Sequence, residues 1–276
     1  MRVAAVQLTS TPDRARNLDA AGALIDGAVD AGAELVALPE LFNGWGSNEE
    51  LRAGAEPLDG PTIEWARARA AKHSVWLVAG SIVELVDDAE RFHNTSCLIA
   101  PDGELAAVYR KVHLFDVDVV GLSYRESATV LAGEELVLAT AGPLTLGMNV
   151  CYDLRFPEQF RAQALAGATA FVLPSAFTAT TGKDHWEPLV RARAIENQVY
   201  VIAPDQCGSS TPKLHWHGRS MIVDPWGVVL AQAPDCECFI TADLDLDALA
   251  EVRRRVPSLE HRRPAVYDRG VRGSKG

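Results

Sequence analysis

The sequence predicts an α/β fold built from two mixed β-sheets that pack face to face. An apolar strand pattern at 1–8 is followed by helical spacing that starts at Thr11-Pro12 and ends at Gly32, and then by a short apolar strand at 35–38. This strand–helix–strand order predicts a crossover connection and parallel pairing. The chain holds about twelve strand-like segments, too many for one open sheet, which indicates two packed sheets.

The remaining elements continue this alternation. Apolar runs bounded by turn residues predict strands at 75–82, 96–100, 105–109, 144–150, 170–173, 199–203, 220–223, 228–232 and 239–242. Helical spacing predicts helices at 62–73, from Pro157, at 185–197 and from about Asp247. The turns at 101–104 and 224–227, Pro-Asp-Gly-Glu and Asp-Pro-Trp-Gly, are typical of hairpins, so the predicted sheets contain antiparallel as well as parallel pairs.

Two stretches without periodicity are predicted to be loops. Residues 112–132 form the longer one, and a loop of that length in a compact domain usually has a function. The other, 176–183, leads to Asp184 as the cap of the helix that follows. No repeat or composition break marks a second domain. We therefore expect one domain over 1–276, with a basic C-terminal tail from about 253 to 276.

Composition excludes several classes of function. The formal net charge is −11 and the pI is about 5.1, which argues against a nucleic-acid partner because no basic excess is present to meet a phosphate backbone. No segment approaches the roughly 18 uninterrupted apolar residues of a membrane span, so no membrane partner is expected. Five cysteines, an odd number, favour a reducing compartment over a disulfide framework. A cytoplasmic location is therefore expected.

Three reactive side chains directly follow predicted strands: Glu40, Lys111 and Cys151. Ligand sites in α/β sheets form at the carboxyl ends of strands, so these side chains are candidates for one site. Glu40 would accept the thiol proton, Cys151 would attack an electrophilic carbon, and Lys111 would stabilise the oxyanion together with the backbone N–H that follows Cys151. Taken singly, each residue also has an ordinary interpretation, as a helix-start charge, a core thiol or a solvated lysine.

Seven ordered motifs make the chain similar to a known superfamily. They are Leu-Pro-Glu at 38–40, Tyr-Arg-Lys-Val-His-Leu-Phe-Asp at 109–116, Cys-Tyr-Asp-Leu-Arg-Phe-Pro-Glu at 151–158, Pro-Ser-Ala-Phe at 174–177, Thr-Gly-Lys-Asp-His-Trp-Glu at 181–187, Arg-Ala-Arg-Ala-Ile-Glu-Asn-Gln at 191–198 and Asp-Pro-Trp-Gly at 224–227. Together they resemble the carbon–nitrogen hydrolase, or nitrilase, superfamily over about 3–267.

The resemblance implies a four-layer αββα sandwich and a Glu-Lys-Cys triad at Glu40, Lys111 and Cys151. A second glutamate of the family site is matched by Glu126, which would position Lys111 or the substrate amide. The implied reaction is hydrolysis of the terminal carboxamide of a small α-keto acid through a cysteine thioester, with release of ammonia. The implied partners are this amide and water, with no cofactor, and a homodimer or larger homo-oligomer is expected.

Several alternatives stay open within and outside this superfamily. The segment 151–158 resembles the Nit-type amidase branch; the tail at 261–264 with Tyr267 is more similar to its deaminated glutathione amidases, and the loop at 115–118 to its omega-amidases. Hydrolases of N-carbamoyl amino acids and nitriles are similar in fold, but Tyr152 stands where strict nitrilases usually have Trp. A non-catalytic scaffold that kept the fold is the remaining alternative.

Substrate-binding residues are expected near the strand ends and in the facing loops. The candidates are Phe42, Asn43, Tyr152, Ser175, Ala176, Phe177 and Thr181. Their ordinary interpretation is as core, turn or cap residues. Arg155 could hold a substrate carboxylate, but an internal ion pair with Glu158 or Glu196 is the interpretation that we favour. No metal site is expected, because Cys236-Glu237-Cys238 and His215-Trp216-His217 lack zinc-site spacing.

Overall fold

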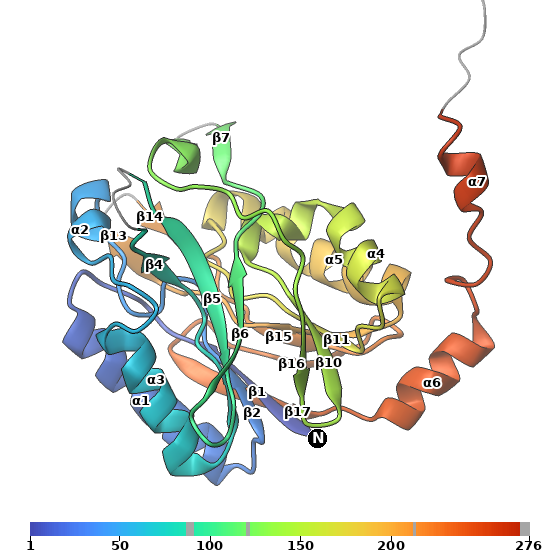
Figure 1. The fold of residues 1–276 in the computed structure, drawn as a ribbon, viewed down its shortest axis with the longest axis horizontal. Coiled ribbons are helices and arrows are strands. Elements are labelled where there is room, and N and C mark those ends of the chain that lie inside the picture. The colour runs from blue at the N-terminus through green and yellow to red at the C-terminus, as the bar shows by residue number, and fades with distance from the viewer. Residues whose placement is uncertain (87–90, 120–121, 212–213, 271–276) are drawn as a thin grey trace, which may run out of the picture.

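Two large mixed sheets pack against each other, with helices on both outer faces (Figure 1). The computed structural model describes residues 1–86, 91–119, 122–211 and 214–270. Helices α1 (Arg14–Asp30) and α3 (Pro61–His73) cover one sheet, and α4 (Pro157–Leu165) and α5 (Ala179–Asn197) cover the other. The expected αββα sandwich is therefore confirmed. In the described ranges, no helix has the length and apolarity to cross a membrane.

The first sheet has the strand order β17-β1-β2-β3-β5-β4, and β6 also pairs with β5. Its strands are β1 (Arg2–Gln7), β2 (Leu35–Ala37), β3 (Trp76–Val78), β4 (Ile82–Glu84), β5 (His93–Ile99), β6 (Leu105–Arg110) and β17 (Cys238–Asp243). Strands β1, β2 and β3 run parallel, as the crossover pattern predicts. The predicted hairpin of β5 and β6 is antiparallel.

The second sheet has the order β16-β15-β12-β11-β10-β9. Its strands are β9 (Leu138–Ala141), β10 (Leu144–Met148), β11 (Ala170–Val172), β12 (Tyr200–Ala203), β15 (Met221–Val223) and β16 (Val229–Gln232). Strands β10, β11 and β12 are parallel, and the outer strands are antiparallel. The turn at 224–227 joins β15 and β16, with Gly227 at a φ of 89°.

Alternating side chains explain the layers. In β1, Val3 and Ala5 belong to the core shared with the second sheet, whereas Ala4 and Val6 pack with the α1 and α3 layer. All four are fully buried. A strand covered on both faces has no polar side to expose, which explains the continuous apolar run in the sequence. Phe160 and Trp186 bring α4 and α5 into the core of the second sheet.

The predicted long loop at 112–132 was wrong in part. It contains the hairpin of β7 (Asp116–Val119) and β8 (Leu122–Arg125), followed by the short helix η1 (Glu126–Ala128). The hairpin is too short to show periodicity in the sequence, and Asp116 fixes its base by accepting hydrogen bonds from Ser127. Another short hairpin, β13 (Ser209–Thr211) with β14 (Leu214–His215), also escaped prediction.

Element boundaries required three further corrections. Helix α5 begins at Ala179, not at His185, with Thr178 as its N-cap, so most of the predicted loop at 176–183 is helical. Helix α1 is capped by Asp13, whose carboxylate accepts the Arg16 N–H, because the Thr11 hydroxyl is engaged by Asn17. The predicted strand 75–82 is divided into β3 and β4 at Gly80, which has a φ of 32°.

Helix α2 (Asn48–Ala53) was not predicted from the sequence. It has a Ser47–Glu50 capping box.

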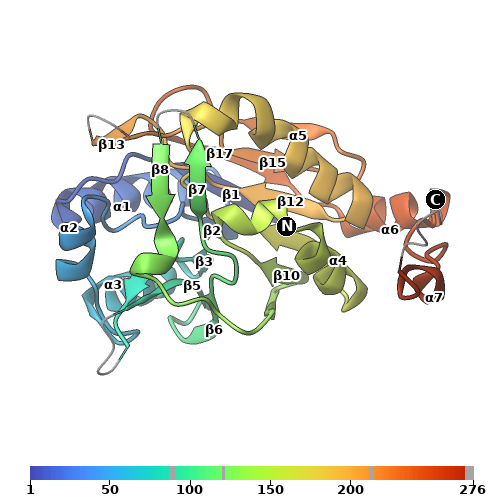
Figure 2. The same cartoon turned by 90° about the horizontal axis from the view of Figure 1, so that it is seen from above.

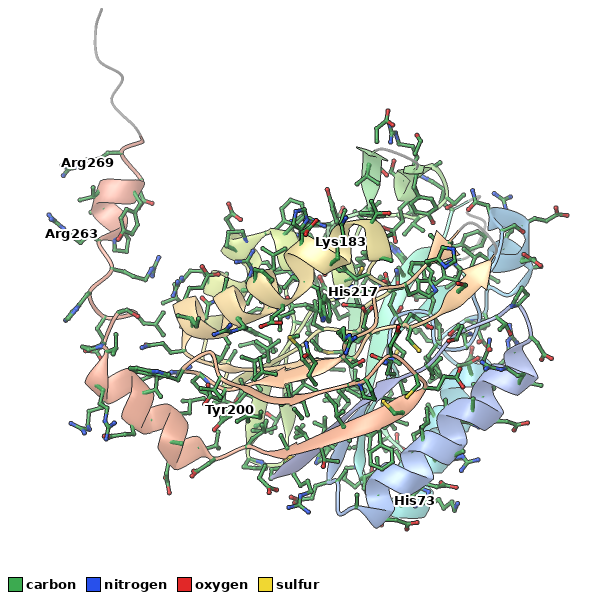
Figure 3. All side chains as sticks on the ribbon, turned by 180° about the vertical axis from the view of Figure 1, so that it is seen from behind. His73, Lys183, Tyr200, His217, Arg263 and Arg269 are labelled. Atoms are coloured by element: carbon green, nitrogen blue, oxygen red, sulfur yellow. The ribbon has the colours of Figure 1, made fainter. Side chains whose placement is uncertain are left out.

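The C-terminal segment leaves the body of the protein (Figures 1 and 2). Helix α6 (Leu246–Arg255) buries only Leu249 among its residues, and α7 (Pro264–Tyr267) buries none. Tyr200 anchors the start of α6 by donating its hydroxyl to the Asp245 carbonyl at 2.8 Å (Figure 3). Beyond Val256 the chain is largely exposed, and Arg263 and Arg269 lie far from the sheets (Figure 3). We call residues 256–270 the C-terminal arm.

Candidate active site

Glu40 lies in a tight turn directly after β2. The turn passes so close to Gly80 that a Cβ there would lie 2.0 Å from the Pro39 carbonyl oxygen, so only glycine fits. The Ser81 hydroxyl accepts the Leu41 N–H at 3.0 Å, and the Gln206 side chain donates to the Glu40 carbonyl at 2.9 Å. These contacts fix the backbone of Glu40, and its carboxylate is 2% exposed.

Lys111 directly follows β6 and is also 2% exposed. Its ammonium donates to Glu40 Oε1 at 2.9 Å and to Glu126 Oε1 and Oε2 at 3.1 and 2.9 Å. The backbone N–H of Lys111 donates to the Asn94 carbonyl at 2.9 Å, which keeps the residue in register with β5. A buried ammonium is stable only when it is paired, and here two carboxylates pair with it.

Glu126 joins this group from η1, 15 residues further along the chain. Its carboxylate also accepts the Phe115 N–H at 2.6 Å. The Asn94 side-chain amide donates both to Glu40 Oε1, at 2.7 Å, and to Glu126 Oε1, at 3.2 Å. The structure therefore brings the two predicted carboxylates together around Lys111, with Asn94 as a shared donor.

Cys151 lies where β10 ends and the short helix η2 (Cys151–Arg155) begins. It has a φ of 46°, unusual for a residue with a side chain, and its N–H donates to the Pro174 carbonyl at 2.9 Å. Cys151 lines the same cleft as Glu40 and Lys111, and the charges of both side chains act on its thiol. The predicted strand-to-helix position of the cysteine is thus confirmed.

Asp153 holds this turn against the strand that carries Lys111. One of its oxygens accepts the Tyr109 hydroxyl at 2.7 Å and the Val150 N–H at 2.8 Å. The other accepts the N–H of His113 at 3.1 Å and lies 2.8 Å from its Nδ1. Because these contacts come from residues on both sides of Lys111 and from the residue before Cys151, a single carboxylate links the two segments.

Burial and charge shift the pKa values of the thiol and the ammonium in the same direction. Burial, with the nearby Glu40 carboxylate, raises the pKa of Cys151 well above its ordinary value, although Lys111 opposes this. Burial alone would lower the pKa of Lys111, but Glu126 and Glu40 outweigh it and hold that pKa well above its ordinary value. The resting site therefore holds a neutral thiol and a charged ammonium, and the thiol needs a base before it can attack.

These side chains form the floor of a cleft. Its void, including the part open to solvent, is about 880 Å³. The walls are largely aromatic and apolar, from Trp45, Phe92, Phe115, Tyr124 and Trp216 among others. Burial, with the charge of Glu126, raises the pKa of Tyr124 to about 12. Phe115 directly precedes β7 and Tyr124 lies in β8, so the β7–β8 hairpin contributes one wall. The rings of Trp45 and Trp216 meet edge to face, with 4.4 Å between their centroids.

Four of the predicted substrate-binding residues line the cleft: Tyr152, Ala176, Phe177 and Thr181. The Ala176 N–H donates to Glu40 Oε2 at 2.9 Å. The other three lie elsewhere, which corrects the expectation. Phe42 is fully buried in the core next to Trp65. Asn43 donates to Glu56 and Thr62 at the start of α3, and the Ser175 hydroxyl, also fully buried, donates to the Leu173 carbonyl.

Arg155 also lines the cleft, contrary to the expected structural ion pair. Its guanidinium lies over the rings of Phe177 and Tyr152, 5.0 and 5.8 Å from their centroids, and 3.2 Å from His185 Nδ1. Glu196 pairs with Arg193 instead. Within the described part of the chain, no acidic side chain lies within ion-pair distance of Arg155. Burial lowers its pKa from the ordinary value.

Sequence reasoning did not assign Asn94 to the site, and for Arg155 it favoured an internal ion pair over a substrate carboxylate. Asn94 had a usable signal, because it is a polar residue at the start of a strand that is otherwise almost wholly buried. A buried side-chain amide needs hydrogen-bond partners, and here the partners are the two carboxylates of the site. For Arg155 the sequence could not decide between the two roles, because the side chains around it, Phe177 and His185, come from α5 and from the segment before it.

Comparison with known proteins identifies the family of this chain. The chain matches the carbon-nitrogen hydrolase family over residues 2–254. It is 45% identical over 263 residues to a deaminated glutathione amidase of Synechocystis sp. (strain PCC 6803 / GT-S), covering 94% of this chain and 97% of the relative. It is 38% identical over 267 residues to omega-amidase NIT2-B of Xenopus laevis, covering 96% of each.

A solved structure extends the likeness to three dimensions. The crystal structure of the C. elegans NitFhit protein superposes with a TM-score of 0.90 at 38% identity, covering 96% of this chain and 66% of that longer chain. The resemblance inferred from the motifs is thus confirmed, and the two relatives, matched over 97% and 96% of their length, are named as amidases. The chain belongs to the carbon–nitrogen hydrolase family.

Proposed function

We propose that this protein hydrolyses the carboxamide of a small α-keto acid through a thioester on Cys151. The observation that carries the proposal is the convergence of Cys151, Glu40, Lys111 and Glu126 on the floor of one cleft. The names of the two relatives, a deaminated glutathione amidase and an omega-amidase, support the substrate class. The whole chain, 1–276, is proposed to act as a single domain.

In the first half-reaction, Glu40 takes the thiol proton and the sulfur attacks the amide carbon. The raised pKa of Cys151 makes this base necessary, because little thiolate is present at neutral pH. The oxyanion is stabilised by the Lys111 ammonium and the backbone N–H of Tyr152. Glu40 then passes its proton to the amide nitrogen, the carbon–nitrogen bond breaks, and ammonia leaves a thioester on Cys151.

In the second half-reaction, Glu40 removes a proton from water, and the hydroxide oxygen attacks the thioester carbon. The carbon–sulfur bond breaks, the thiol regains its proton from Glu40, and the free acid departs. Glu126 does not exchange protons in this scheme. It holds the Lys111 ammonium through both carboxylate oxygens, which keeps that charge aimed at the reacting carbonyl.

Arg155 is proposed to hold the carboxylate of the substrate. It is a guanidinium on the wall of the cleft, stacked on two aromatic rings that keep it in place. Guanidinium groups bind carboxylates through two parallel hydrogen bonds, and a partly buried one without an acidic partner gains most from such a ligand. When the acid group of the substrate is bound at Arg155, the amide at the other end of a short substrate can reach Cys151.

The decisive experiment compares C151A with C236S, which removes an exposed cysteine instead. Each variant is incubated with α-ketoglutaramate, α-ketosuccinamate and deaminated glutathione, and the released acid is measured by chromatography. C151A is expected to release none, and C236S to match the wild type. Mass spectrometry of acid-quenched wild type should reveal an acyl adduct on Cys151. Full activity in C151A would overturn the proposal.

The same measurement separates the alternatives. An N-carbamoyl amino acid and a nitrile are included as further substrates, and preferential turnover of either would replace the proposed substrate class. If no acyl adduct forms with any compound, the protein is a scaffold that retains the fold. The intact group around Lys111 speaks for the enzyme, because a buried ammonium with two carboxylates is costly to keep without a use.

We also propose that the protein forms a homodimer or a larger homo-oligomer. The C-terminal arm supports this, because Val256, Val266 and Tyr267 are 44%, 45% and 59% exposed on a segment that leaves the body. Light scattering on a chain that ends at Arg255 tests it, with a smaller assembly expected than for the full chain. A cytoplasmic location is proposed as well, supported by five free cysteines.

A further inference from the structure

Asp205 is a buried acid that the proposed reaction does not use. It follows β12 and is fully buried. One of its carboxyl oxygens accepts the Phe177 N–H at 2.8 Å, and its own backbone N–H donates to the Ser220 hydroxyl at 2.8 Å. The other carboxyl oxygen has no hydrogen-bond partner, and within the described residues no basic side chain lies within ion-pair distance of it.

The surroundings of Asp205 disfavour a negative charge. From the turn after β2 comes the carboxylate of Glu40, which repels it. Cys207 lies two residues after Asp205 and carries a thiol. His217 and Arg219 lie on the segment that follows β14, and neither side chain hydrogen-bonds to Asp205. Burial, and after it the charge of Glu40, raises the pKa of Asp205 well above the ordinary value, although backbone N–H groups, that of Phe177 first, act against the shift.

Asp205 acts on the segment that supplies a donor to Glu40. The Ser175 N–H donates to the Pro204 carbonyl, and the Gln206 N–H donates back to Ser175, at 2.9 and 3.0 Å. With the Phe177 N–H on the Asp205 carboxyl, the residues on both sides of Ala176 are fixed. The N–H of Ala176 itself is then free to donate to Glu40 Oε2 at 2.9 Å.

We propose that Asp205 is a positioning residue that works as a neutral carboxylic acid. It holds the Phe177 amide so that the Ala176 N–H stays on Glu40, and its proton removes a charge that would otherwise oppose the Glu40 carboxylate. This inference rests on the proposed function, because it assigns Glu40 the role of base. The protonated form also explains why the second carboxyl oxygen is tolerated without a cation, since an uncharged hydroxyl is far cheaper to bury than a carboxylate.

The test compares D205A with the isosteric, uncharged D205N. D205A removes the acceptor for Phe177, so kcat is expected to fall about 100-fold with little change in KM. D205N keeps an oxygen acceptor in the same place and is expected to restore most of the lost kcat. A D205N variant as slow as D205A would overturn the neutral-acid role, and a D205A variant with wild-type kcat would overturn the positioning role.

Two further readouts do not depend on catalysis, so they remain informative if the proposed function fails or if D205A does not fold. In the wild type, Asp205 stays protonated when folded and ionises when unfolded, so its contribution to the free energy of unfolding falls as pH rises above the ordinary aspartate pKa. The stability of D205N relative to wild type should therefore increase with pH. A difference that is constant with pH would overturn the protonated state.

The second readout is the infrared carbonyl band of a protonated carboxylic acid in the folded protein at neutral pH. We expect this band in the wild type and its loss in D205N. D153N is the matched control, because it changes another fully buried aspartate, one whose two oxygens both accept hydrogen bonds. The band should persist in D153N. Its absence from the wild type, or its survival in D205N, would contradict the inference.

Discussion

The Lys111 ammonium donates to both carboxylate oxygens of Glu126, at 3.1 and 2.9 Å, in a part of the cleft floor that is almost closed to solvent. Glu40 takes only one hydrogen bond from the same ammonium, at 2.9 Å. This division separates two tasks. Glu126 fixes the position of Lys111 through two hydrogen bonds, while the second oxygen of Glu40 accepts the Ala176 N–H.

Replacing Glu126 by Gln should reduce catalysis through Lys111. The amide that replaces the Glu126 carboxylate has only one oxygen that can accept from the ammonium, so the Lys111 side chain is held less firmly in place. We therefore expect kcat to fall about 100-fold with a smaller change in KM. Steady-state kinetics on the amide substrate measure this. The control is E84Q, which alters a buried glutamate that pairs with Arg110 instead. Unchanged kcat in E126Q would refute the assigned role.

Replacing Glu40 by Gln should make Cys151 easier to ionise although it abolishes turnover. The Glu40 carboxylate raises the pKa of this thiol, so its removal lowers that pKa, and the pH midpoint of alkylation by iodoacetamide should move down. Amide hydrolysis should fall by about 10²- to 10⁴-fold, because the base is lost. Alkylation rates are measured against pH by mass spectrometry. A midpoint that moves upward would contradict this electrostatic account.

Replacing Arg155 by Met should weaken the binding of acidic amides. Methionine keeps the apolar stem against the aromatic rings, so the loss is that of the charge. We expect KM for α-ketoglutaramate to rise by about 10- to 100-fold with kcat nearly unchanged. Butyramide, which has no carboxylate, should react equally well with wild type and R155M. An equal loss of kcat/KM for both amides would show that Arg155 does not bind the acid group of the substrate.

Two glycine-to-alanine changes in helices should have opposite outcomes. A Cβ on Gly182 of α5 would lie 2.3 Å from Cγ of His217, whose N–H holds the Phe177 carbonyl, so G182A should lower the free energy of unfolding by about 1–3 kcal/mol. A Cβ on Gly22 of α1 would meet only the flexible end of Arg69, so G22A should stay within about 1 kcal/mol of wild type. Urea unfolding of both variants checks the pair.

The proposed catalytic residues could be predicted from the sequence because each of them stands shortly after a strand, and the ends of these strands meet in space. Glu40, Lys111 and Cys151 each come within three residues of the end of a strand, and side chains at the carboxyl ends of strands are the usual candidates for a site in an α/β fold. The two sheets could be predicted for a similar reason, since strands buried on both faces are continuously apolar. Short hairpins such as β7–β8 could not, because a few residues show no period.

The direction of a side chain within a turn was not readable from the sequence. Phe42, Asn43 and Ala176 are all close to strand ends, yet the first packs in the core, the second donates to the side chains of Glu56 and Thr62, and the third faces the cleft. The turn after β2 has a positive φ at Leu41, which changes the direction of the chain. Leucine rarely adopts this conformation, so the sequence does not predict it. Arg155 depended in the same way on the packing of distant elements.

The site spans the boundary between the two sheets, since Glu40 and Lys111 follow strands of the first and Cys151 follows a strand of the second. Neither half of the chain therefore holds an active fragment. Recovery of activity during refolding should therefore report the docking of the two sheets and not the formation of one sheet alone. An acyl group on Cys151 that is held by Lys111 also acts as a temporary cross-link, so the acylated enzyme should resist separation of its halves longer than the free enzyme.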